Sequence, residues 1–452
     1  MPASPLSPAP VRPERGVIAL FAVGQFGWSL ASYAAGNLLA YFYLPQEDGA
    51  PMFPTFVYQG GVLGVLTIVG LISFGGRIFD AATDPLIASL SDRSKARMGR
   101  RRFFMLLGAL PFAASGFLLF WPPSNTSLTL NAVWLAAMSV VYYLSFTLYV
   151  IPYSALISEL GHDSADRLRI SAWTSVAWAL GFVCGNAIYA LQSLLEVKGL
   201  TSLEAFGGAL GALQALALLA LLTPVALLDE KRYAQAQSGR ADLRTSLRAV
   251  WSNANYRRFL FSDLLYWLAL TFVQLGMAYY AVLLLGLDKS YAFYFALSGF
   301  VGSFALYLPV TLLALRIGKK PLMLTAYGVF AAVFGALAAS AWIPLAPAPL
   351  LFVLGALSAW PLAIFGILPT ALIADEAARD GGQRGTSLAG MYFASRTLIM
   401  KAGISLANLI FPSLLLLGKS VENPAGVRLS ALLALGACVL SAGMFVRYKE
   451  KR

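Results

Sequence analysis

Long apolar stretches, separated by short polar or Pro- and Gly-containing breaks, follow one another along almost the whole chain. An α-helix needs roughly 20 predominantly apolar residues to cross a bilayer, and the stretches are about that long or longer. The pattern predicts an all-α polytopic membrane protein with twelve transmembrane helices. The stretches lie near residues 17–44, 58–90, 103–121, 130–157, 170–194, 205–228, 259–286, 291–315, 321–342, 348–374, 388–417 and 424–446.

One long polar segment, residues 229–258, divides these stretches into two groups of six. We expect it to be a central loop that joins an N-terminal six-helix bundle, residues 17–228, to a C-terminal six-helix bundle, residues 259–446. A Pro-rich arm, residues 1–16, precedes the first stretch, and its composition predicts disorder. A short basic tail, residues 447–452, follows the last stretch.

The two halves show weak internal symmetry. The basic loop SDRSKARMGRRR, residues 91–102, follows the second stretch, and the shorter RIGKK, residues 316–320, follows the eighth. Parallel six-helix repeats place such loops at corresponding positions, so we expect two pseudo-symmetric bundles. Chance similarity between apolar segments is the alternative explanation.

Composition narrows the class of protein. Hydrophobic residues make up 59% of the 452 residues and charged residues only 12%, which excludes an ordinary soluble enzyme. The two cysteines lie in apolar stretches and the one histidine in a polar loop, so no zinc or disulfide framework is expected. With no GxSxG motif and no Cys/His pair in register, we expect neither an enzyme nor a cofactor.

The net charge of +12 is distributed unevenly between the two sides of the predicted bundle. Of the 33 Lys and Arg residues, 26 fall in the arm, the tail and the loops on one side, and four in the loops on the other. By the positive-inside rule, both termini and the central loop are predicted to be cytoplasmic, in a multi-pass protein of the inner (plasma) membrane. Anionic lipid head groups are the expected partners of these basic loops, and nucleic acid is not.

A few ionisable residues remain inside the predicted spans, where such groups are costly and usually functional. Asp80, Thr83 and Asp84 share one helical face, with Arg77 one turn before them. Two carboxylates and a hydroxyl suit a hard monovalent cation such as Na⁺, or a shared proton. One arginine cannot neutralise both carboxylates, so Lys401 is the candidate for the second counter-charge. An internal salt-bridge knot between Arg77 and an aspartate is the alternative.

The segment GRIFDAATDPLIASLSDRSKARMGRRRFFMLLGALPF, residues 76–112, resembles the helix 2 to helix 3 signature of the glycoside-pentoside-hexuronide:cation symporters. These form the melibiose permease family of the major facilitator superfamily. TLYVIPYSALISEL, residues 147–160, is a further similar segment, and the resemblance covers nearly the whole chain. It implies a twelve-helix fold with two lobes, alternating access and a coupling ion, which is Na⁺, H⁺ or Li⁺.

The family's cation site maps well onto this chain. Asp80 and Asp84 match its two coordinating aspartates, and Thr147 matches its helix 4 threonine. Thr83 stands where the melibiose permease has Asn, and Lys401 matches its helix 11 lysine. The resemblance thus implies that the acidic cluster binds the coupling cation.

The family's sugar site maps badly. Ser29, Val150 and Thr174 stand where the family has two aspartates and an arginine that bind galactosides. The resemblance therefore implies a more neutral and apolar cavity, suited to another glycoside or to an amphiphile, as in the related vertebrate lysolipid transporters. The residues expected to line it are Gln25, Ser29, Tyr149, Val150, Trp173, Thr174 and Gln274.

A cytoplasmic gate is also implied. Arg100, Arg101 or Arg102 would pair with Glu159 or with helix C-termini when the carrier faces outward, and Asp92 belongs to the same group. Plain surface charge on a solvated loop is the alternative.

We therefore predict a cation-coupled secondary active symporter for a glycoside-like or amphiphilic small molecule, functional as a monomer. A lysophospholipid transporter of the same fold and a non-transporting membrane receptor are the competing hypotheses.

Overall fold

The computed structural model describes residues 11–47, 52–62, 64–162, 164–233, 251–384 and 389–450. Within these ranges the secondary structure is helical, apart from two isolated β-bridges. The long helices are α1 (Arg15–Tyr33, continued by η1, Ala34–Leu38, and α2, Leu39–Tyr43), α3 (Ile68–Arg93), α4 (Arg100–Leu118), α5 (Leu128–Leu160), α6 (Ser164–Val197), α7 (Ser202–Leu227), α10 (Ala254–Tyr279, continued by η2, Tyr280–Leu284), α11 (Tyr291–Ile317), α12 (Lys319–Ala338), α13 (Pro347–Arg384), α14 (Ala389–Leu414) and α15 (Ala425–Val446). The short elements are α8 (Glu230–Tyr233), η3 (Ser340–Trp342) and η4 (Leu415–Leu417).

Ten helical segments in the described part of the chain are long and apolar enough to cross a membrane. Helices α3 and α4 are not among them, so apolarity alone does not reproduce the predicted count of twelve spans. Both are long, at 26 and 19 residues, but α3 carries charges in its middle and α4 begins with three arginines. The charged residues lower the mean apolarity of these two helices. Both helices nevertheless pack against other helices of the bundle.

Several predicted boundaries differ from the structure, among them the start of α6 at Ser164 rather than near residue 170 and the end of α13 at Arg384 rather than near residue 374. Helix α3 begins at Ile68 rather than near residue 58, because the preceding Gly-rich segment turns and Gly64 has a φ of 89°. The Thr67 side chain then caps the helix by accepting a hydrogen bond from the backbone of Gly70. Helix α10 begins at Ala254, inside the expected central loop, where the side chain of Asn253 caps its first turn.

Some sequence expectations lie outside the described residues. These are the first ten residues of the predicted disordered arm, most of the central loop (residues 234–250), and the last two residues of the tail.

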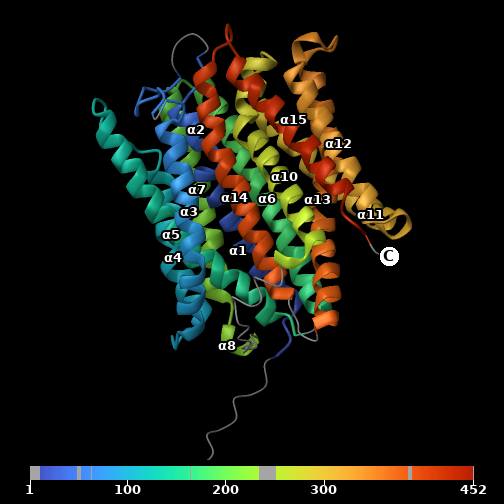
Figure 1. Ribbon diagram of the computed structural model, residues 1–452. Helices are drawn as coiled ribbons and strands as arrows, with labels where there is room; N and C mark the ends of the chain where they lie inside the picture. The colour runs from blue at the N-terminus through green and yellow to red at the C-terminus, as the bar shows by residue number, and fades with distance from the viewer. Residues whose placement is uncertain are drawn as a thin grey trace, which may run out of the picture.

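The helices form two halves that lie side by side (Figure 1). In the first half α1 packs on α6 and α7, and α4 packs on α5; in the second α10 packs on α14 and α15, and α11 packs on α13. The halves meet where α3 lies against α14 and where α6 lies against α11. The apolar faces of these helices are thereby buried against one another.

Corresponding carboxylates close the two halves. Glu230, just after α7, accepts hydrogen bonds of 2.9–3.1 Å from the backbone N–H groups of Arg101 and Arg102 at the start of α4. Glu450, just after α15, accepts bonds of 2.7 and 2.9 Å from Lys319 and Lys320 at the start of α12. A carboxylate at a helix N-terminus satisfies free N–H groups and the helix dipole. The repeated contact agrees with the expected internal symmetry.

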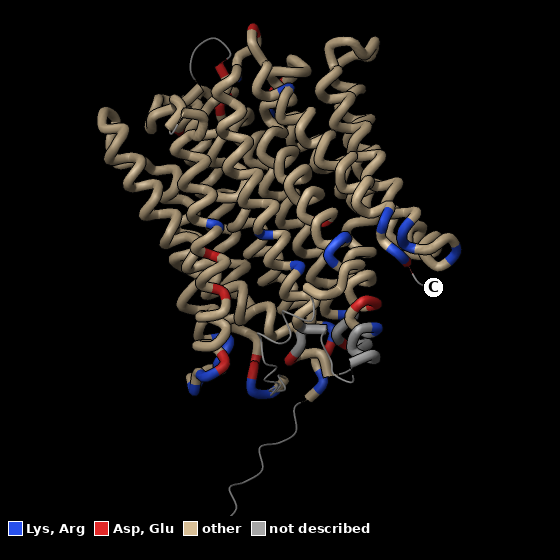
Figure 2. Tube along the Cα trace, in the orientation of Figure 1, with Lys and Arg blue, Asp and Glu red and all other residues tan. Residues whose placement is uncertain are grey.

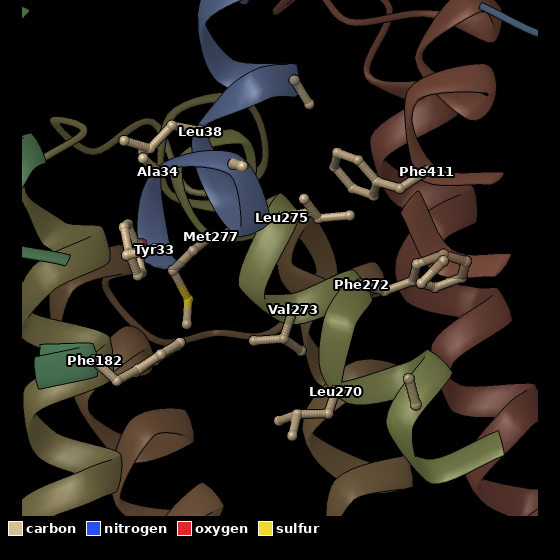
Figure 3. Packing of buried hydrophobic residues seen from close by; sticks show 14 of the residues in the cluster. Tyr33, Ala34, Leu38, Phe182, Leu270, Phe272, Val273, Leu275, Met277 and Phe411 are labelled. Carbon is tan, nitrogen blue, oxygen red and sulfur yellow. The ribbon is translucent and has the colours of Figure 1, made fainter. Parts of the chain in front are cut away.

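Aromatic side chains fill the interior where α10 meets its neighbours. Figure 3 shows Phe272 of α10 near Phe411 of α14, and Met277 near Tyr33 of α1. The Phe272 and Phe411 ring centroids are 6.2 Å apart. Helix α10 thus contacts both halves, since the hydroxyl of Tyr279 also donates to the carbonyl of Leu44.

Charged residues gather at one end of the bundle, where α8 lies (Figure 2). We call this the α8 end and the other the far end.

Candidate functional site

An acidic pair and a lysine meet where the two halves touch. Asp80 and Asp84 project from α3, and Lys401 projects from α14 of the other half. The Lys401 ammonium lies 2.9 Å from Asp80 Oδ2 and also contacts Asp84 Oδ2. Asp80 is fully buried, whereas 20% of the Asp84 side chain and 13% of the Lys401 side chain are exposed. Lys401 therefore bridges both carboxylates across the interface between the halves.

Two threonines complete this cluster, which we call the α3–α14 cluster: Asp80, Thr83, Asp84, Thr147 and Lys401. The Thr147 hydroxyl, on α5, donates a 2.9 Å hydrogen bond to Asp80 Oδ1. Thr83 Oγ1 lies 3.4 Å from Thr147 Oγ1 and also donates to the backbone carbonyl of Phe79 at 3.0 Å. The structure thus brings together the predicted cation-site residues.

The cluster has unused acceptor capacity. Asp84 Oδ1 and Asp80 Oδ2 are buried without a hydrogen-bond partner, although the latter lies beside the lysine. Among the described residues, no group of three or more His, Cys, Asp or Glu side chains is placed to hold a metal ion. Two carboxylates with hydroxyls form an all-oxygen set, which suits a hard cation or a proton.

Arg77 does not pair directly with either aspartate of the cluster. Its guanidinium lies over the ring of Tyr143, 5.2 Å from the ring centroid, and forms no ion pair with a described carboxylate. Its Nε is buried without a hydrogen-bond partner. The alternative of a salt-bridge knot between Arg77 and an aspartate is therefore not seen among the described residues, and a counter-charge role for Arg77 stays a prediction. The attraction of the ring face and the closer approach of Lys401 account for the difference.

The other charged pair inside the bundle lies wholly in the second half. Arg396 of α14 donates to both carboxylate oxygens of Asp263 of α10, at 3.0 and 3.3 Å. This bidentate pair ties two helices of one half, whereas Lys401, five residues further along α14, reaches across to the other half.

A cavity of about 320 Å³ lies between the halves, within the usual range for small-molecule sites. Its lining carries no Asp, Glu, Lys or Arg among the described residues. Several of its side chains have polar groups without a described partner, among them the Gln25 and Gln274 amides and the buried indole N–H of Trp28. The lining comprises Gln25, Trp28, Ser154, Ile157, Thr174, Ser175, Trp178, Ala179, Tyr266, Trp267, Leu270, Gln274, Phe300, Ser303, Tyr307, Leu362, Phe365 and Gly366.

Three of the seven residues expected in the cavity line it: Gln25, Thr174 and Gln274. The other four do not, which corrects the prediction. The Ser29 hydroxyl donates 2.7 Å to the carbonyl of Trp178, and the Tyr149 hydroxyl donates 2.9 Å to that of Leu221. Both polar groups are therefore used to join helices.

Val150 and Trp173 are not part of the lining either, although Trp173 directly precedes Thr174, which is. Val150 packs against the apolar core, and Trp173 is half-exposed. Alignment with the family located the right helices, but one residue of shift rotates a helical side chain by about 100°.

Aromatic side chains form much of the cavity wall, and sequence reasoning had treated them as packing. Helical spacing from the polar residues would have found two of them. Trp28 follows Gln25 by three residues and Trp178 follows Thr174 by four, so each pair shares a face. On the opposite wall, Trp267 and Leu270 precede Gln274 on α10.

The α3–α14 cluster and the cavity are joined through close helix packing. A Cβ atom at Gly403, two residues after Lys401, would lie 2.5 Å from the backbone carbonyl of Leu264 and 3.3 Å from Cβ of Trp267. Because only glycine fits, α14 lies directly against the segment of α10 that lines the cavity. A movement of α14 at Lys401 would therefore also displace Trp267.

The predicted gate residues form contacts within the first half. Glu159, at the end of α5, accepts from Arg100 at 2.8 Å and from Arg101 at 2.7 Å. Arg101 also contacts Asp92 at 2.5 Å, and Arg102 donates to the carbonyl of Val225 near the end of α7. Since these residues belong to α3, α4, α5 and α7, their contacts do not connect the two halves in this structure.

Further ion pairs between the halves, besides the α3–α14 cluster, lie at the far end. Lys289, in the loop before α11, binds Glu196 of α6 at 2.6 Å, and Asp288 accepts from Ser193 at 3.1 Å. Lys419, after η4, donates to Gln59 and lies 3.4 Å from Glu47. Hydrogen bonds from Ser290 and Ser193 and the charge of Lys289 lower the pKa of Asp288, although its burial acts in the opposite direction.

Comparison with known proteins shows the family. Over residues 20–446 the sequence matches the family described as MFS/sugar transport protein. It is 24% identical over 268 residues to the inner membrane symporter YicJ of Escherichia coli (strain K12), which covers 58% of this chain and 57% of the relative. It is 27% identical over 169 residues to sodium-dependent lysophosphatidylcholine symporter 1 of Xenopus tropicalis, covering 37% of this chain and 29% of the relative. The match thus spans little more than half the length of YicJ and less than a third of the length of the lysophosphatidylcholine symporter.

Solved structures share the fold. Nucleoside transporter NupG superimposes with a TM-score of 0.62 at 14% identity, covering 96% of this chain and 99% of that one. Xylose transporter XylE from E. coli, in a partially occluded inward open conformation, gives a TM-score of 0.61 at 12% identity, covering 96% and 98%. These matches confirm the predicted fold class and the resemblance to the symporters, and both the family and the structural neighbours are transporters rather than enzymes.

Proposed function

This chain belongs to the MFS/sugar transport family, and on that premise we propose that it is a cation-coupled symporter that moves a small uncharged or amphiphilic solute by alternating access. The observation that carries the proposal is Lys401, which reaches from one half of the protein to both carboxylates of the other. A buried ion pair that spans the moving interface is the arrangement that a coupling ion can make or break.

The coupling ion takes the place of the Lys401 ammonium. Both are monovalent, so the exchange leaves the charge around Asp80 and Asp84 unchanged and costs little electrostatic energy. The free carboxylate oxygens and the hydroxyls of Thr83 and Thr147 supply the oxygen ligands that Na⁺ requires. Na⁺ is the proposed ion, and H⁺ or Li⁺ at the same carboxylates are the alternatives. Release of Lys401 removes a contact that holds α14 against α3.

The basic residues at the α8 end support a cytoplasmic location for that end and for both termini. In that orientation the described ion pairs at the far end close the outer side, and the cavity is reached from the cytoplasm. The halves then rock about the α3–α14 and α6–α11 contacts. Ion and solute each favour the same arrangement, so each raises the affinity of the other by the same factor.

The cavity supports an uncharged solute with several hydroxyl groups, such as a neutral glycoside. Gln25 lines the cavity from the first half and Gln274 from the second. Their amides have no described partner, so they are free to bind hydroxyls. Trp28, Trp178 and Trp267 offer flat apolar faces to the C–H surface of a sugar ring. A charged sugar acid would meet no opposite charge in this lining and would lose its hydration without compensation.

An amphiphile is the second candidate, because an apolar hollow of about 30 Å³ adjoins the cavity. The hollow shares Leu270, Gln274, Phe300 and Leu362 with the cavity, and its lining also includes Phe182, Val273 and Met277, which are labelled in Figure 3. The hollow has about the volume of a single water molecule in the liquid, so it would take the first apolar group of a tail rather than a whole chain. The similarity to a lysophosphatidylcholine symporter fits this candidate.

The test is solute counterflow in proteoliposomes with a panel of neutral glycosides and a panel of lysolipids, each with Na⁺ or with choline as the cation. We expect Na⁺-dependent flux of one panel, lost in Asp80→Asn and Asp84→Asn and retained in Glu422→Gln, which changes an exposed carboxylate in the loop before α15. Flux that is equally strong without Na⁺, and unchanged by pH or Li⁺, would contradict cation coupling. No flux with either panel, despite ligand binding, would favour the receptor hypothesis.

A further inference from the structure

A groove on the membrane-facing side of the second half combines arginines at one end with an apolar floor. It has a volume of about 660 Å³ and lies between the start of α10 and the end of α15. We propose that this groove binds an anionic phospholipid, with the phosphate held by Arg257, Arg258 and Arg447. The proposal does not depend on the transport mechanism, because the groove lies apart from the cavity between the halves.

The three arginines lie close together around the start of α10 and the end of α15. Arg257 and Arg258 are in the first turn of α10, and Arg447 follows the last residue of α15. Arg258 donates one hydrogen bond of 3.0 Å to the backbone carbonyl of Arg447, and Arg257 donates one of 3.0 Å to that of Trp251. Each guanidinium has five N–H donors, so most remain free for a phosphate.

No described carboxylate neutralises these arginines. Asp263, one turn further along α10, is buried and held by Arg396. Glu450, three residues after Arg447, is used by the backbone of Lys319 and Lys320. The groove therefore carries a net positive charge, which complements an anion.

The space for a head group continues beyond the arginines. Arg258 and Arg447 also line a second hollow, of about 830 Å³, with Lys320, Lys449 and one carboxylate, Glu450, which accepts hydrogen bonds from the backbone of Lys319 and Lys320. The basic groups thus surround the position where the head group of a lipid in the groove would lie.

The floor of the groove suits an acyl chain. It is formed by Phe261 of α10 and by Val439, Leu440, Gly443 and Met444 of α15, all of them exposed. A Cβ at Gly443 would meet no atom within 4 Å, so nothing in the protein fills the groove there. Both helices are apolar enough to span a membrane, which places this floor against lipid.

These two features together indicate a lipid rather than a free anion. The acyl chain is in hydrocarbon both before and after binding, so the apolar floor sets the position and the arginines supply the preference for negative charge. A zwitterionic lipid carries its own cation beside the phosphate and gains less from three arginines. Phosphatidylglycerol is therefore expected to bind better than phosphatidylcholine.

The experiment uses the full-length protein in detergent and measures lipid binding by native mass spectrometry, with thermal stabilisation as a second readout. We expect phosphatidylglycerol to bind at least tenfold more tightly than phosphatidylcholine. The triple variant Arg257→Gln, Arg258→Gln, Arg447→Gln should lose about a hundredfold in affinity for phosphatidylglycerol. Arg316→Gln, which removes an exposed arginine of the same half outside both hollows, should lose little.

A second variant tests the floor without changing the charge. Gly443→Leu fills the groove and should weaken binding of phosphatidylglycerol, whereas Gly328→Leu, at another exposed glycine with no atom near its Cβ, should not. Equal binding of the two lipids, or unchanged binding by the triple variant, would overturn the proposal. Binding of glycerol phosphate as tight as that of phosphatidylglycerol would also overturn it, since the site would then be one for a soluble anion.

Discussion

Replacement of Lys401 by methionine removes the ammonium that bridges the α3–α14 cluster and keeps most of the side-chain volume. Asp80 and Asp84 then lie next to each other without the cation that now contacts both. We expect the Lys401→Met protein to be less stable in Na⁺-free buffer and to regain stability when Na⁺ is added, because the ion occupies the position of the lost ammonium.

The magnitude follows from the burial of the pair. Removal of one partner of a buried ion pair costs about 3–5 kcal/mol. Since 20% of the Asp84 side chain is exposed, we take the lower value, about 3 kcal/mol. An unfolding entropy of about 2.1 cal/mol/K per residue gives about 0.9 kcal/mol/K for 452 residues, so the unfolding temperature should fall by about 3 °C. Na⁺ at about 100 times its Kd would restore about 2.7 kcal/mol.

The assay is thermal unfolding in detergent at constant ionic strength, with NaCl replaced stepwise by choline chloride. Lys289→Met is the matched control: it also removes a buried lysine from a pair between the halves, but leaves a single carboxylate, Glu196, which keeps a hydrogen bond from Gln192. The control should lose stability without becoming Na⁺-dependent. The reasoning fails if Na⁺ stabilises both variants equally, or if Lys401→Met loses nothing in Na⁺-free buffer.

Three further predictions follow from other contacts. Gly403→Leu should destabilise the protein by about 1–3 kcal/mol in thermal unfolding, because its Cβ would lie 2.5 Å from the Leu264 carbonyl, whereas Gly436→Leu, with open space around it, should not. Burial lowers the pKa of Lys419 in the folded protein, so the unfolded chain binds its proton more readily. The free energy of unfolding should therefore rise with pH between the lowered value and the usual value of about 10.4, and Lys419→Met should flatten that rise in pH-dependent unfolding. Glu196→Gln, which weakens the ion pair at the far end, should increase labelling of a cysteine introduced there by an impermeant maleimide; unchanged labelling would speak against a closure role for this pair.

The α3–α14 cluster was predictable because charge is rare inside an apolar chain. Asp80, Thr83 and Asp84 share a face through local helical spacing alone, so their mutual proximity needs no knowledge of the fold. Lys401 was found by its distance from the ends of its apolar stretch. That it bridges both carboxylates, while Arg77 lies over Tyr143, depends on how two distant helices pack, and no sequence spacing gives that rotation.

The cavity was predictable only in part for the same reason. Gln25, Thr174 and Gln274 marked the right helices, and for the two glutamines the reason is that an uncompensated amide must face either a partner or a space. Ser29 and Tyr149 have partners instead of a space, since their hydroxyls donate to backbone carbonyls of neighbouring helices. Residue type alone does not distinguish a hydroxyl that lines a cavity from one that joins two helices.

The carboxylates that close each half bear on how the protein is made. Glu230 fastens α7 to the start of α4 with residues that all belong to the first half, and Glu450 does the same for α15 and α12 in the second. During synthesis the first fastening is complete as soon as residue 230 has left the ribosome, whereas the second waits for residue 450. The first half can therefore reach its final packing while the second is still being translated, because each of these two contacts uses residues of one half alone.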